Sequence, residues 1–317
     1  MIKNIGLGTA AIGRPQYINI RQKQQVTPFD LVAFQKNGKA ILEAAYQQGI
    51  RYFDTAPGYG LAEQLVLDWV QEKQDASIEV ATKWGYTYVA NFDPTATVHE
   101  IKEHSLSKLN EQWQVSKQLL PYLKVYQIHS ATLDTGVLDN QSILNQLAHL
   151  QSAHQLVIGL TASGDNQTAI LRQAMNIQIA GKSLFDLFQV TYNLFDQSIA
   201  SLLPALKATG KQIVVKEALA NGRVFPNKKY PHYQAAYQTL QRLANKYNVG
   251  IDAIALRFCI DTLSPFKVLS GASISQHLTA NLKVNDFKLA PPDILSLKNC
   301  QVAPKQYWSE RKLLAWN

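Results

Sequence analysis

The sequence predicts an α/β protein of the (β/α)8 or TIM-barrel class, formed as a single domain over residues 1–317. Eight short segments with strand character alternate with helical segments, which is the repeat expected of such a barrel. Several strand segments are apolar nearly throughout, as parallel strands covered by helices are. The length also suits one α/β barrel. A doubly wound open sheet is the alternative, and it is disfavoured because no strand leads into a G-x-G-x-x-G turn with an acidic residue further on.

The N-terminal part begins with a strand at 5–9 (IGLGT), whose glycines allow a ligand to approach the backbone closely. Residues 14–37 are rich in glutamine and lack a clear helical period, so we expect a long connection there. Connections of that length are usually functional or mobile. A helix is expected at 39–48, because its apolar residues recur on one face.

Segment 51–63 (RYFDTAPGYGLAE) combines a strand, a turn and the start of a helix. It opens with bulky residues that favour a strand and becomes polar at Asp54. The Pro and Gly residues that follow punctuate a turn around Tyr59. An apolar helical period begins at Leu61. The segment therefore places an acid at a strand end and a phenol in the loop after it.

The remaining elements are predicted from the same alternation of apolar runs and helical periods. Residues 112–121 are expected to be a polar extension that lengthens the third crossover on the helix side of the barrel. A helical tail is expected at the C-terminus. Strands are expected at 77–84, 123–129, 156–161, 185–192, 212–216 and 267–270, and helices at 98–109, 140–151, 166–175, 199–209, 233–247, 251–263 and 275–282.

The composition and charge of the chain indicate which kinds of partner and which cellular compartment to expect. The net charge of +8 favours anionic partners in general, but the longest basic run is Lys228-Lys229 and no nucleic-acid motif accompanies it, so no nucleic-acid partner is expected. Two cysteines, Cys259 and Cys300, without metal-ligand spacing indicate a reducing interior. The start MIKNIGLGTA lacks a long apolar export segment, and no apolar run reaches about 18 residues. We expect a cytoplasmic protein with no membrane partner.

Polar, titratable side chains stand at or just beyond three neighbouring strand ends. These are Asp54 with Tyr59, then Lys83, then His129. Each has an ordinary structural alternative: a turn cap, a packed ring, a solvated strand end or a satisfied core histidine. Because the carboxyl ends of barrel strands share one mouth, where such folds keep their chemistry, we expect the four side chains to meet there.

The four groups make chemical sense together. A phenol titrates near 10, so Tyr59 is a reluctant acid or base unless a neighbouring ammonium lowers its pKa. We expect Lys83 to do this, with Asp54 holding it in place. His129 would orient a carbonyl oxygen and stabilise a developing alkoxide. Protonation of a carbonyl oxygen must accompany hydride delivery to its carbon, and no side chain supplies hydride, so a nicotinamide cofactor is implied.

The motifs FDTAPGYG-x-x-E, VATK and QIH resemble the catalytic segments of the aldo-keto reductase family. IGLT, FQVTYN, KEALANGR and GAS-x-x-x-x-L-x-x-N resemble its cofactor segments, in order from Ile5 to Asn281. The resemblance implies hydride exchange between NADP(H) or NAD(H) and a small carbonyl or sugar substrate, in a (β/α)8 barrel without metal. It makes Tyr59 the general acid/base, supported by Asp54, Lys83 and His129. GRPQYIN and KEALANGR look more like the corresponding segments of bacterial aldose-dehydrogenase relatives than like those of the xenobiotic reductases.

The resemblance also implies a set of nucleotide contacts, in which several residues depart from the family pattern. Thr161-Ala162 replaces the common Ser-Asn pair, leaving Gln189 as the more plausible second contact to the nicotinamide amide, and Lys216 stands where many members stack an aromatic ring. Gly271 and His277 occupy positions where NADPH-specific members often carry cations, and Ala280 lacks a carboxylate for the adenine amine. The implied cofactor-binding residues are Gly8, Thr9, Thr161, Gln189, Lys216, Ala218, Leu219, Gly271, Ser273, His277 and Asn281.

Two other functions compete with this interpretation. A Schiff-base aldolase on the same barrel would use Lys83 as nucleophile, but needs it neutral, and Asp54 opposes that. A cofactor-binding, redox-sensing regulatory subunit is the second, against which the intact set of four side chains argues. The substrate, the direction of reaction and the oligomeric state have no signal in the sequence. Loops 14–37, 84–93, 131–140 and 223–232 would build the substrate pocket, with Trp84, Tyr86 and Tyr88 as aromatic walls.

Overall fold

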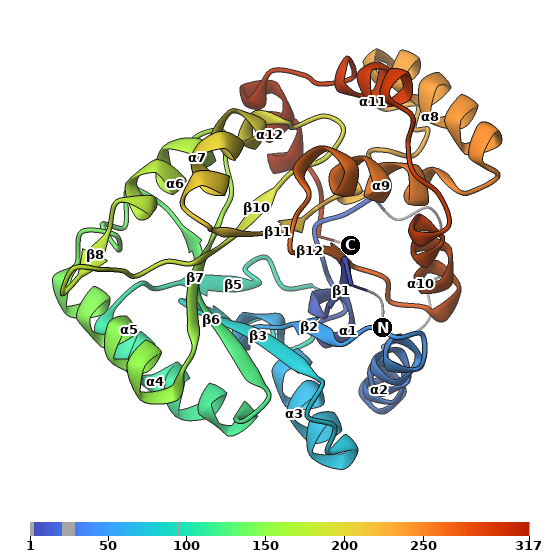
Figure 1. The fold of residues 1–317 in the computed structure, drawn as a ribbon. Coiled ribbons are helices and arrows are strands. Elements are labelled where there is room, and N and C mark those ends of the chain that lie inside the picture. Colours follow the sequence, from blue (N-terminus) through green and yellow to red (C-terminus); the bar gives the residue numbers. More distant parts are fainter. Residues whose placement is uncertain (1–2, 21–28, 94, 317) are drawn as a thin grey trace.

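A closed barrel of parallel strands forms the centre of the computed structural model, which describes residues 3–20, 29–93 and 95–316 (Figure 1). This confirms the (β/α)8 class. Around the ring the order is β1 (Ile5–Gly8), β12 (Lys267–Ser270), β11 (Gln212–Lys216), β10 (Leu187–Thr191), β7 (Val157–Ala162), β6 (Leu123–Ala131), β3 (Glu79–Trp84) and β2 (Tyr52–Asp54).

Helices surround the barrel and cover its outer face (Figure 1). They are α1 (Ala10–Gly13), α2 (Leu31–Gln47), α3 (Ala62–Lys73), α4 (Leu106–Ser116), α5 (Gln141–His154), α6 (Gln167–Met175), α7 (Leu203–Ala208), α8 (Gln234–Tyr247), α9 (Ile251–Leu263), α10 (Ser275–Leu282), α11 (Pro291–Lys298) and α12 (Pro304–Lys312). Two antiparallel hairpins lie outside the barrel, β4 (Tyr86–Tyr88) with β5 (Glu100–Lys102) and β8 (Gln178–Ile179) with β9 (Lys182–Ser183). Short 3-10 turns are η1 (Pro57–Tyr59), η2 (Lys117–Leu119), η3 (Ser198–Leu202), η4 (Ala220–Gly222), η5 (Pro231–Tyr233) and η6 (Lys283–Asn285).

A buried layer of side chains fills the barrel interior below the mouth. Its members come from five strands, and they are Tyr52, Ala81, Val125, Leu187 and Val214. Side chains along a strand alternate between its two faces, so the residue two positions further on points to the same side. The apolar layer therefore has a polar layer above it, made by Asp54, Lys83, Gln127, Gln189 and Lys216.

The expected connection over 14–37 is wrong in its second half, because α2 already begins at Leu31. The Asp30 carboxylate caps the helix by accepting from the backbone N–H groups of Val32 at 2.9 Å and Ala33 at 3.1 Å. Residues 21–28 of this connection lie outside the described residues. The short helix α1 is an addition that the sequence did not predict.

The helix expected at 98–109 is also wrong at its start. Residues Glu100–Lys102 pair instead with Tyr86–Tyr88 as a hairpin, and α4 begins after Ser105, whose hydroxyl accepts from the N–H of Lys108 at 3.0 Å. The expected polar extension 112–121 is helical through Ser116. Its residue Gln112 accepts from Gly85 N–H and donates to the Tyr86 carbonyl, both at 2.8 Å, so it holds the loop after β3.

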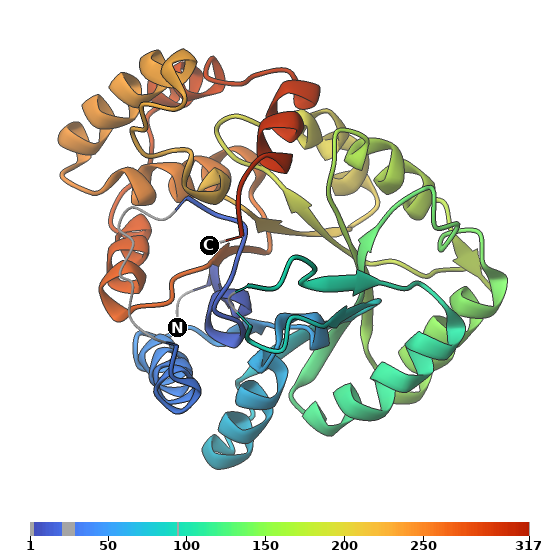
Figure 2. The same cartoon turned by 180° about the vertical axis from the view of Figure 1, so that it is seen from behind.

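The segment after α1 and the segment after α12 meet over the barrel mouth. Ile18 and Trp316 form an isolated antiparallel bridge, and Figure 2 shows the segment after α12 running beside the N-terminal segment. Both segments lie on the side that carries the β4–β5 hairpin. Loops from opposite ends of the sequence therefore cover the strand ends where the candidate site lies.

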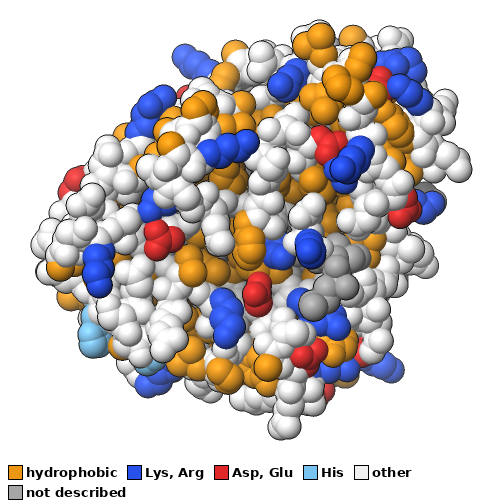
Figure 3. Space-filling model, viewed as in Figure 1, with side chains coloured by type: hydrophobic (Ala, Val, Ile, Leu, Met, Phe, Trp, Pro, Cys, Tyr) orange, Lys and Arg blue, Asp and Glu red, His pale blue; other side chains and the backbone are white. Residues whose placement is uncertain are grey.

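The surface carries mixed charge. Figure 3 shows Lys and Arg side chains interspersed with acidic and apolar ones on the face drawn, without a continuous basic stripe among the side chains coloured there. Within the described ranges, no helix is long and apolar enough to cross a membrane. Likewise, the described His, Cys, Asp and Glu side chains form no cluster suited to a metal ion.

Candidate active site

A buried ion pair forms the floor of the site. Lys83, at the penultimate position of β3, donates to Asp54 Oδ1 at 2.5 Å and to the Thr55 carbonyl oxygen at 2.9 Å. Both charged side chains are shielded from solvent, with 0% of the Lys83 side chain and 2% of the Asp54 side chain exposed. β2 and β3 are neighbours with Asp54 opposite Ala81, so the strand register brings the two groups together.

The second carboxylate oxygen of Asp54 is also engaged. Gln189 Nε2 donates to Oδ2 at 2.7 Å, and Gln127 Nε2 lies 3.4 Å from the same oxygen. The carboxylate is thus held from three sides by an ammonium and two amides. A buried carboxylate with these partners has a fixed orientation, which in turn fixes the position of Lys83.

Tyr59 lies above this pair at the end of η1. The centroid of its ring is 4.7 Å from Lys83 Nζ and 5.3 Å from the centroid of the His129 ring. The turn is held against α1, where Leu61 N–H donates to the Gly13 carbonyl at 2.8 Å. A Cβ atom at Gly13 would stand 2.1 Å from the Tyr59 carbonyl oxygen, so only glycine allows α1 to hold the turn this closely.

The pKa of Tyr59 moves opposite to our expectation. We expected Lys83 to lower it. Burial instead raises the pKa of the phenol well above its usual value, the Asp54 carboxylate raises it further, and the Arg14 guanidinium opposes both. Burial likewise lowers the pKa of the Lys83 ammonium, an effect that Asp54 opposes. Tyr59 is therefore a protonated phenol at neutral pH.

His129 completes the group from the neighbouring strand β6. Burial lowers the pKa of its imidazole well below the usual value, and the cations Lys83 and Arg14 lower it further. Its Nδ1 atom is buried without a hydrogen-bond partner, and its ring lies 4.6 Å from that of Tyr86 between centroids. His104 Nε2 lies 2.9 Å from the backbone carbonyl of His129. The imidazole is thus neutral, with one N–H to donate.

Arg14 is part of the site, and sequence analysis missed it. Its guanidinium is 4% exposed, pairs with Glu100 at 2.7 Å and donates to the Gly58 carbonyl at 3.1 Å. The guanidinium carbon lies 5.5 Å from the Tyr59 ring centroid and 4.8 Å from that of Trp316. No sequence signal could have found this cluster, because its members come from four distant segments.

The three aromatic residues that were expected to line the substrate pocket lie in different places. Tyr86 lies against His129, as the ring distance above shows, and is at the site. Trp84 is fully buried and packs on the His104 ring at 5.6 Å between centroids, so it belongs to the core. Tyr88 packs against Phe92 at 5.4 Å.

Three of the residues expected to bind the cofactor are buried and paired with protein. Thr9 donates its hydroxyl to the Asp54 carbonyl at 3.0 Å. The Thr161 hydroxyl oxygen accepts from Ser130 N–H at 2.7 Å, which leaves its own proton to be donated. Gln189 donates to Asp54 as described above, and Gly8 lies opposite Asp54 in the β1–β2 register. Thr9 therefore supports Asp54, while Thr161 keeps a donor.

Lys216 ends β11 on the far wall of the mouth. Its ammonium donates to Ser163 Oγ at 2.7 Å and to Thr191 Oγ1 at 2.9 Å. Burial lowers its pKa to about 8. Beyond it, Ala218 is buried and Leu219 is partly exposed, in the loop that leads to η4. This loop lies beside the mouth, where the sequence placed a cofactor segment.

The last four expected residues lie around the final barrel loop and α10. Gly271 and His277 are exposed and Ser273 is partly exposed, and a Cβ atom at Gly271 would meet nothing within 4 Å. The first turn of α10 has no side-chain cap, so its backbone N–H groups suit a phosphate. Asn281, unlike the other three, is buried. Its side-chain amide donates to Asp252 at 2.9 Å and accepts from Ser270 at 3.2 Å.

The donor set fits a nicotinamide dinucleotide at both ends. Near the chemistry stands the Thr161 hydroxyl, which keeps a proton to donate, and at the rim stands the uncapped start of α10. An α/β barrel with a phenol, a neutral imidazole and a buried lysine–carboxylate pair at one mouth has the arrangement of an oxidoreductase that acts on carbonyls and alcohols.

Comparison with known proteins gives the family. A model of the Aldo/keto reductase family matches residues 4–301, and the chain belongs to this family. It is therefore an oxidoreductase of a family that generally uses NADP(H) or NAD(H) and acts on small carbonyl or sugar substrates.

The relatives are distant. D-threo-aldose 1-dehydrogenase of a Pseudomonas species is 24% identical over 276 residues, covering 76% of this chain and 81% of the relative. The aldo-keto reductase YhdN of Bacillus subtilis is 22% identical and covers 91% of this chain and 87% of its own. The solved holo form of an aldo-keto reductase from Bacillus halodurans superposes with a TM-score of 0.71 at 19% identity, over 95% of this chain and 92% of that one. This last likeness shows the fold.

Proposed function

We propose that this protein interconverts a carbonyl, in an aldehyde, ketone or aldose, and the corresponding alcohol, with NADP(H) or NAD(H) as hydride carrier. The observation that carries the proposal is the buried Lys83–Asp54 pair beside Tyr59, with His129 on the next strand. A structural role alone does not explain this arrangement, because burying two charges and an unpartnered imidazole nitrogen at a barrel mouth costs stability.

In the direction of reduction, Tyr59 is the proton donor to the carbonyl oxygen. Its raised pKa keeps the phenol protonated at neutral pH. His129, neutral because its pKa is lowered, donates a hydrogen bond to the same oxygen and stabilises the alkoxide as it forms. The nicotinamide, when bound, supplies the hydride that side chains lack.

Lys83 and Asp54 serve the phenolate that remains after Tyr59 has lost its proton. The ammonium lies 4.7 Å from the ring centroid and is held there by the 2.5 Å bond to Asp54. In the direction of oxidation the phenolate must form before the alcohol proton is taken, and the same cation stabilises it.

The nucleotide is proposed to extend from the ends of β7, β10 and β11 to the start of α10. Thr161, Gln189 and Lys216 would contact the nicotinamide end, beside Ala218 and Leu219. Gly271, Ser273 and His277 would lie along the phosphate and adenosine end, where α10 offers backbone N–H groups. Asn281 would support this end indirectly through Ser270.

The competing aldolase chemistry requires Lys83 as a neutral amine. The short bond to Asp54 and the second bond to the Thr55 carbonyl both favour the ammonium, and neither leaves a lone pair for attack on a carbonyl carbon. Borohydride treatment in the presence of a substrate would trap a Schiff base, and none is expected.

The test is a panel of aldehydes, ketones and free aldoses, assayed with both reduced nucleotides and, for the alcohols and sugars, both oxidised ones. We expect turnover with at least one pair, and its loss in Tyr59→Phe. Nucleotide binding by the wild type without turnover of any panel member would favour the regulatory-subunit alternative instead.

A further inference from the structure

Lys216 lies across the barrel from the catalytic lysine. In the ring order, three strands lie between β11 and β3 in either direction, so the two strands are opposite each other. Lys216 follows the inward-pointing Val214 by two residues, as Lys83 follows Ala81. The two ammonium groups also influence each other, because Lys83 contributes to lowering the pKa of Lys216. Lys216 therefore faces the reaction space from the wall opposite Tyr59.

The charge of Lys216 is not cancelled by a carboxylate of its own. Both groups bonded to its ammonium are neutral hydroxyls, those of Ser163 and Thr191. Among the ion pairs of the described residues, none includes Lys216. A cation placed on two hydroxyls at a barrel mouth keeps its field directed toward whatever occupies that mouth.

The neighbouring Glu217 offsets this cation only in part, because its carboxylate is bonded to Arg311. Arg311 of α12 grips its carboxylate with Nη2 at 2.6 Å and Nε at 3.1 Å from Oε1. This pair is neutral as a unit, so Lys216, Glu217 and Arg311 together carry a net charge of +1. Glu217 has φ = 54°, a left-handed conformation, and the bond to Arg311 holds it there.

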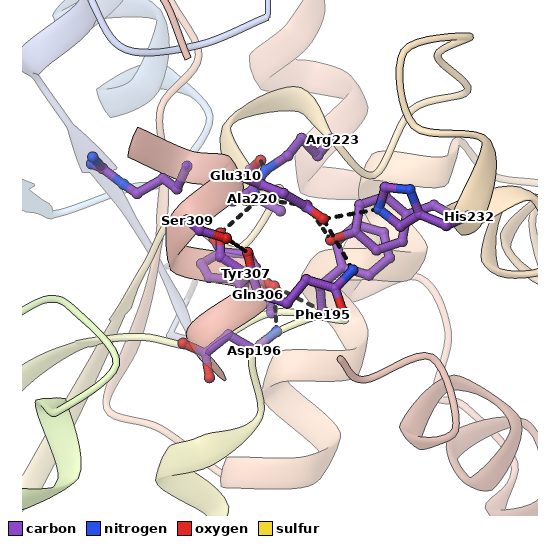
Figure 4. Close-up of polar contacts among 12 residues, drawn as sticks. Phe195, Asp196, Ala220, Arg223, His232, Gln306, Tyr307, Ser309 and Glu310 are labelled. Carbon is purple, nitrogen blue, oxygen red and sulfur yellow. Dashed lines mark hydrogen bonds and ion pairs between the residues drawn. The ribbon is translucent and has the colours of Figure 1, made fainter. Parts of the chain in front are cut away.

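The helix that carries Arg311 is firmly docked. Figure 4 shows Arg223 and His232 meeting Glu310, the residue before Arg311. The Arg223 side chain is fully buried and also donates to the Tyr307 carbonyl at 3.1 Å. The position of Arg311, and with it the neutralisation of Glu217, is thus built into the fold.

We propose that Lys216 is a specificity-determining residue for the oxidation state of the nucleotide, disfavouring the cationic oxidised nicotinamide relative to the neutral reduced one. This rests on the proposed function. The two forms of one nucleotide differ at the ring by a single positive charge, so every phosphate and ribose contact cancels in the comparison. An ammonium that is bonded only to hydroxyls, on the wall beside the ring, raises the free energy of the oxidised form alone.

The consequence concerns the direction of reaction. When an alcohol is oxidised, one hydride leaves its carbon for the nicotinamide C4 and the hydroxyl proton leaves through Tyr59. The positive charge of the ring disappears in this step, which relieves the repulsion with Lys216. The enzyme-bound equilibrium is therefore displaced toward carbonyl product and reduced nucleotide.

The test compares dissociation constants of the oxidised and reduced forms of the same nucleotide by quenching of intrinsic fluorescence at about pH 7. Two unit charges about 5 Å apart at an effective dielectric constant of about 20 repel enough to change an affinity by more than tenfold. In Lys216→Met we expect the ratio of oxidised to reduced dissociation constants to fall by about tenfold. Lys216→Arg keeps the charge and should retain the wild-type ratio within about threefold.

A second variant works in the opposite direction and leaves the Lys216 side chain in place. Glu217→Gln leaves the charge of Arg311 uncompensated, so the ratio should rise above that of the wild type. An unchanged ratio in Lys216→Met, or an unchanged or lower one in Glu217→Gln, would overturn the inference while leaving the proposed function intact. Failure of the wild type to bind either form would overturn the proposed function itself.

Discussion

The two walls of the barrel mouth differ in how they treat charge. On the wall of β2, β3 and β6, the Lys83 cation is matched by Asp54 within the site, and Tyr59 and His129 are both neutral at pH 7. On the wall of β7, β10 and β11, Lys216 has only hydroxyl partners, and its acidic neighbour is taken by Arg311. The first wall suits proton donation, while the second discriminates charge on the nucleotide.

The two walls also favour opposite directions of the reaction. A protonated Tyr59 at neutral pH is ready to reduce a carbonyl, whereas an uncompensated Lys216 favours the product state of alcohol oxidation. Lys216 can be altered without removing a hydrogen bond of Asp54 or Lys83, because β11 lies opposite β3 and the Lys216 ammonium is bonded to Ser163 and Thr191. Variants on one wall should therefore change proton transfer and variants on the other should change nucleotide discrimination.

The largest effect is expected from removing the phenolic proton. Tyr59→Phe should lower the rate of carbonyl reduction by at least about 10²- to 10⁴-fold, the usual contribution of general acid catalysis. Nucleotide affinity should be nearly unchanged, since the hydroxyl serves only the reacting oxygen. Steady-state kinetics and nucleotide titration of the same preparation check both. A variant that retains more than about a tenth of wild-type turnover would remove Tyr59 from its assigned role.

A smaller effect is expected from removing the cation beside the phenol. In Lys83→Met the phenolate loses its nearest positive charge, so the pKa of Tyr59, already raised by burial, should rise further. Alcohol oxidation requires the phenolate, and its rate should therefore become appreciable only at higher pH than in the wild type. The measurement is kcat for oxidation against pH, with Lys83→Arg as the charge-retaining control. An unchanged basic limb would mean that Lys83 does not tune Tyr59.

On the wall that carries Lys216, the preference for reduced nucleotide should depend on pH. The pKa of Lys216 is lowered to about 8, above all by burial, and further by the charges of Arg311 and Lys83, while Glu217 and Asp196 raise it. Lys216 is charged below this value, so the preference for reduced nucleotide should be full near pH 6.5 and be lost as pH rises through about 8.

Lys216→Arg is the matched control for this titration, because a guanidinium stays charged across that range. Its ratio of oxidised to reduced dissociation constants should be flat from about pH 6.5 to 9.5. A wild-type ratio that is equally flat would assign the discrimination to something other than the Lys216 ammonium.

The smallest effect concerns the 2′-phosphate at the far end of the nucleotide. Neither Gly271 nor His277 is a Lys or Arg that could bind the 2′-phosphate. A charge-assisted hydrogen bond to such a phosphate is worth about 1.5–3 kcal/mol. The net charge of +8 attracts NADPH more than NADH, but salt screens that attraction over about 8 Å. We expect discrimination of less than about tenfold between NADPH and NADH, roughly one pKa unit's worth of energy. Titration of both at about 0.15 M salt checks this, and a preference for NADPH above about a hundredfold would contradict it.

Local sequence pattern was enough to predict the barrel and the meeting of Asp54, Tyr59, Lys83 and His129 at one mouth. The bounds expected for β11, β12, α9 and α10 agree with the structure, because each is a continuous apolar or periodic run between clear breaks. Three of the four candidates, Asp54, Lys83 and His129, follow from strand ends, since register in a closed barrel fixes their neighbours, and Tyr59 follows from the turn after β2.

What the sequence could not predict depends on contacts between distant segments. The β4–β5 hairpin pairs residues 12 to 16 positions apart around a loop, and local pattern assigns its second strand to the start of a helix. Arg14 reaches Tyr59 only because Glu100 and Trp316 close around it. The direction of the Tyr59 pKa shift was also missed, since burial can be judged only from the folded structure.

The central claim is that this barrel moves a hydride between a nicotinamide and a carbonyl carbon while Tyr59 moves the proton. The most direct measurement is a single turnover of each member of the carbonyl panel with reduced nucleotide deuterated at C4 on the transferable face. The account predicts that the wild type forms an alcohol with one deuterium on the former carbonyl carbon, and that Tyr59→Phe forms almost none. Nucleotide binding by the wild type with no deuterium transferred to any aldehyde, ketone or aldose would contradict it.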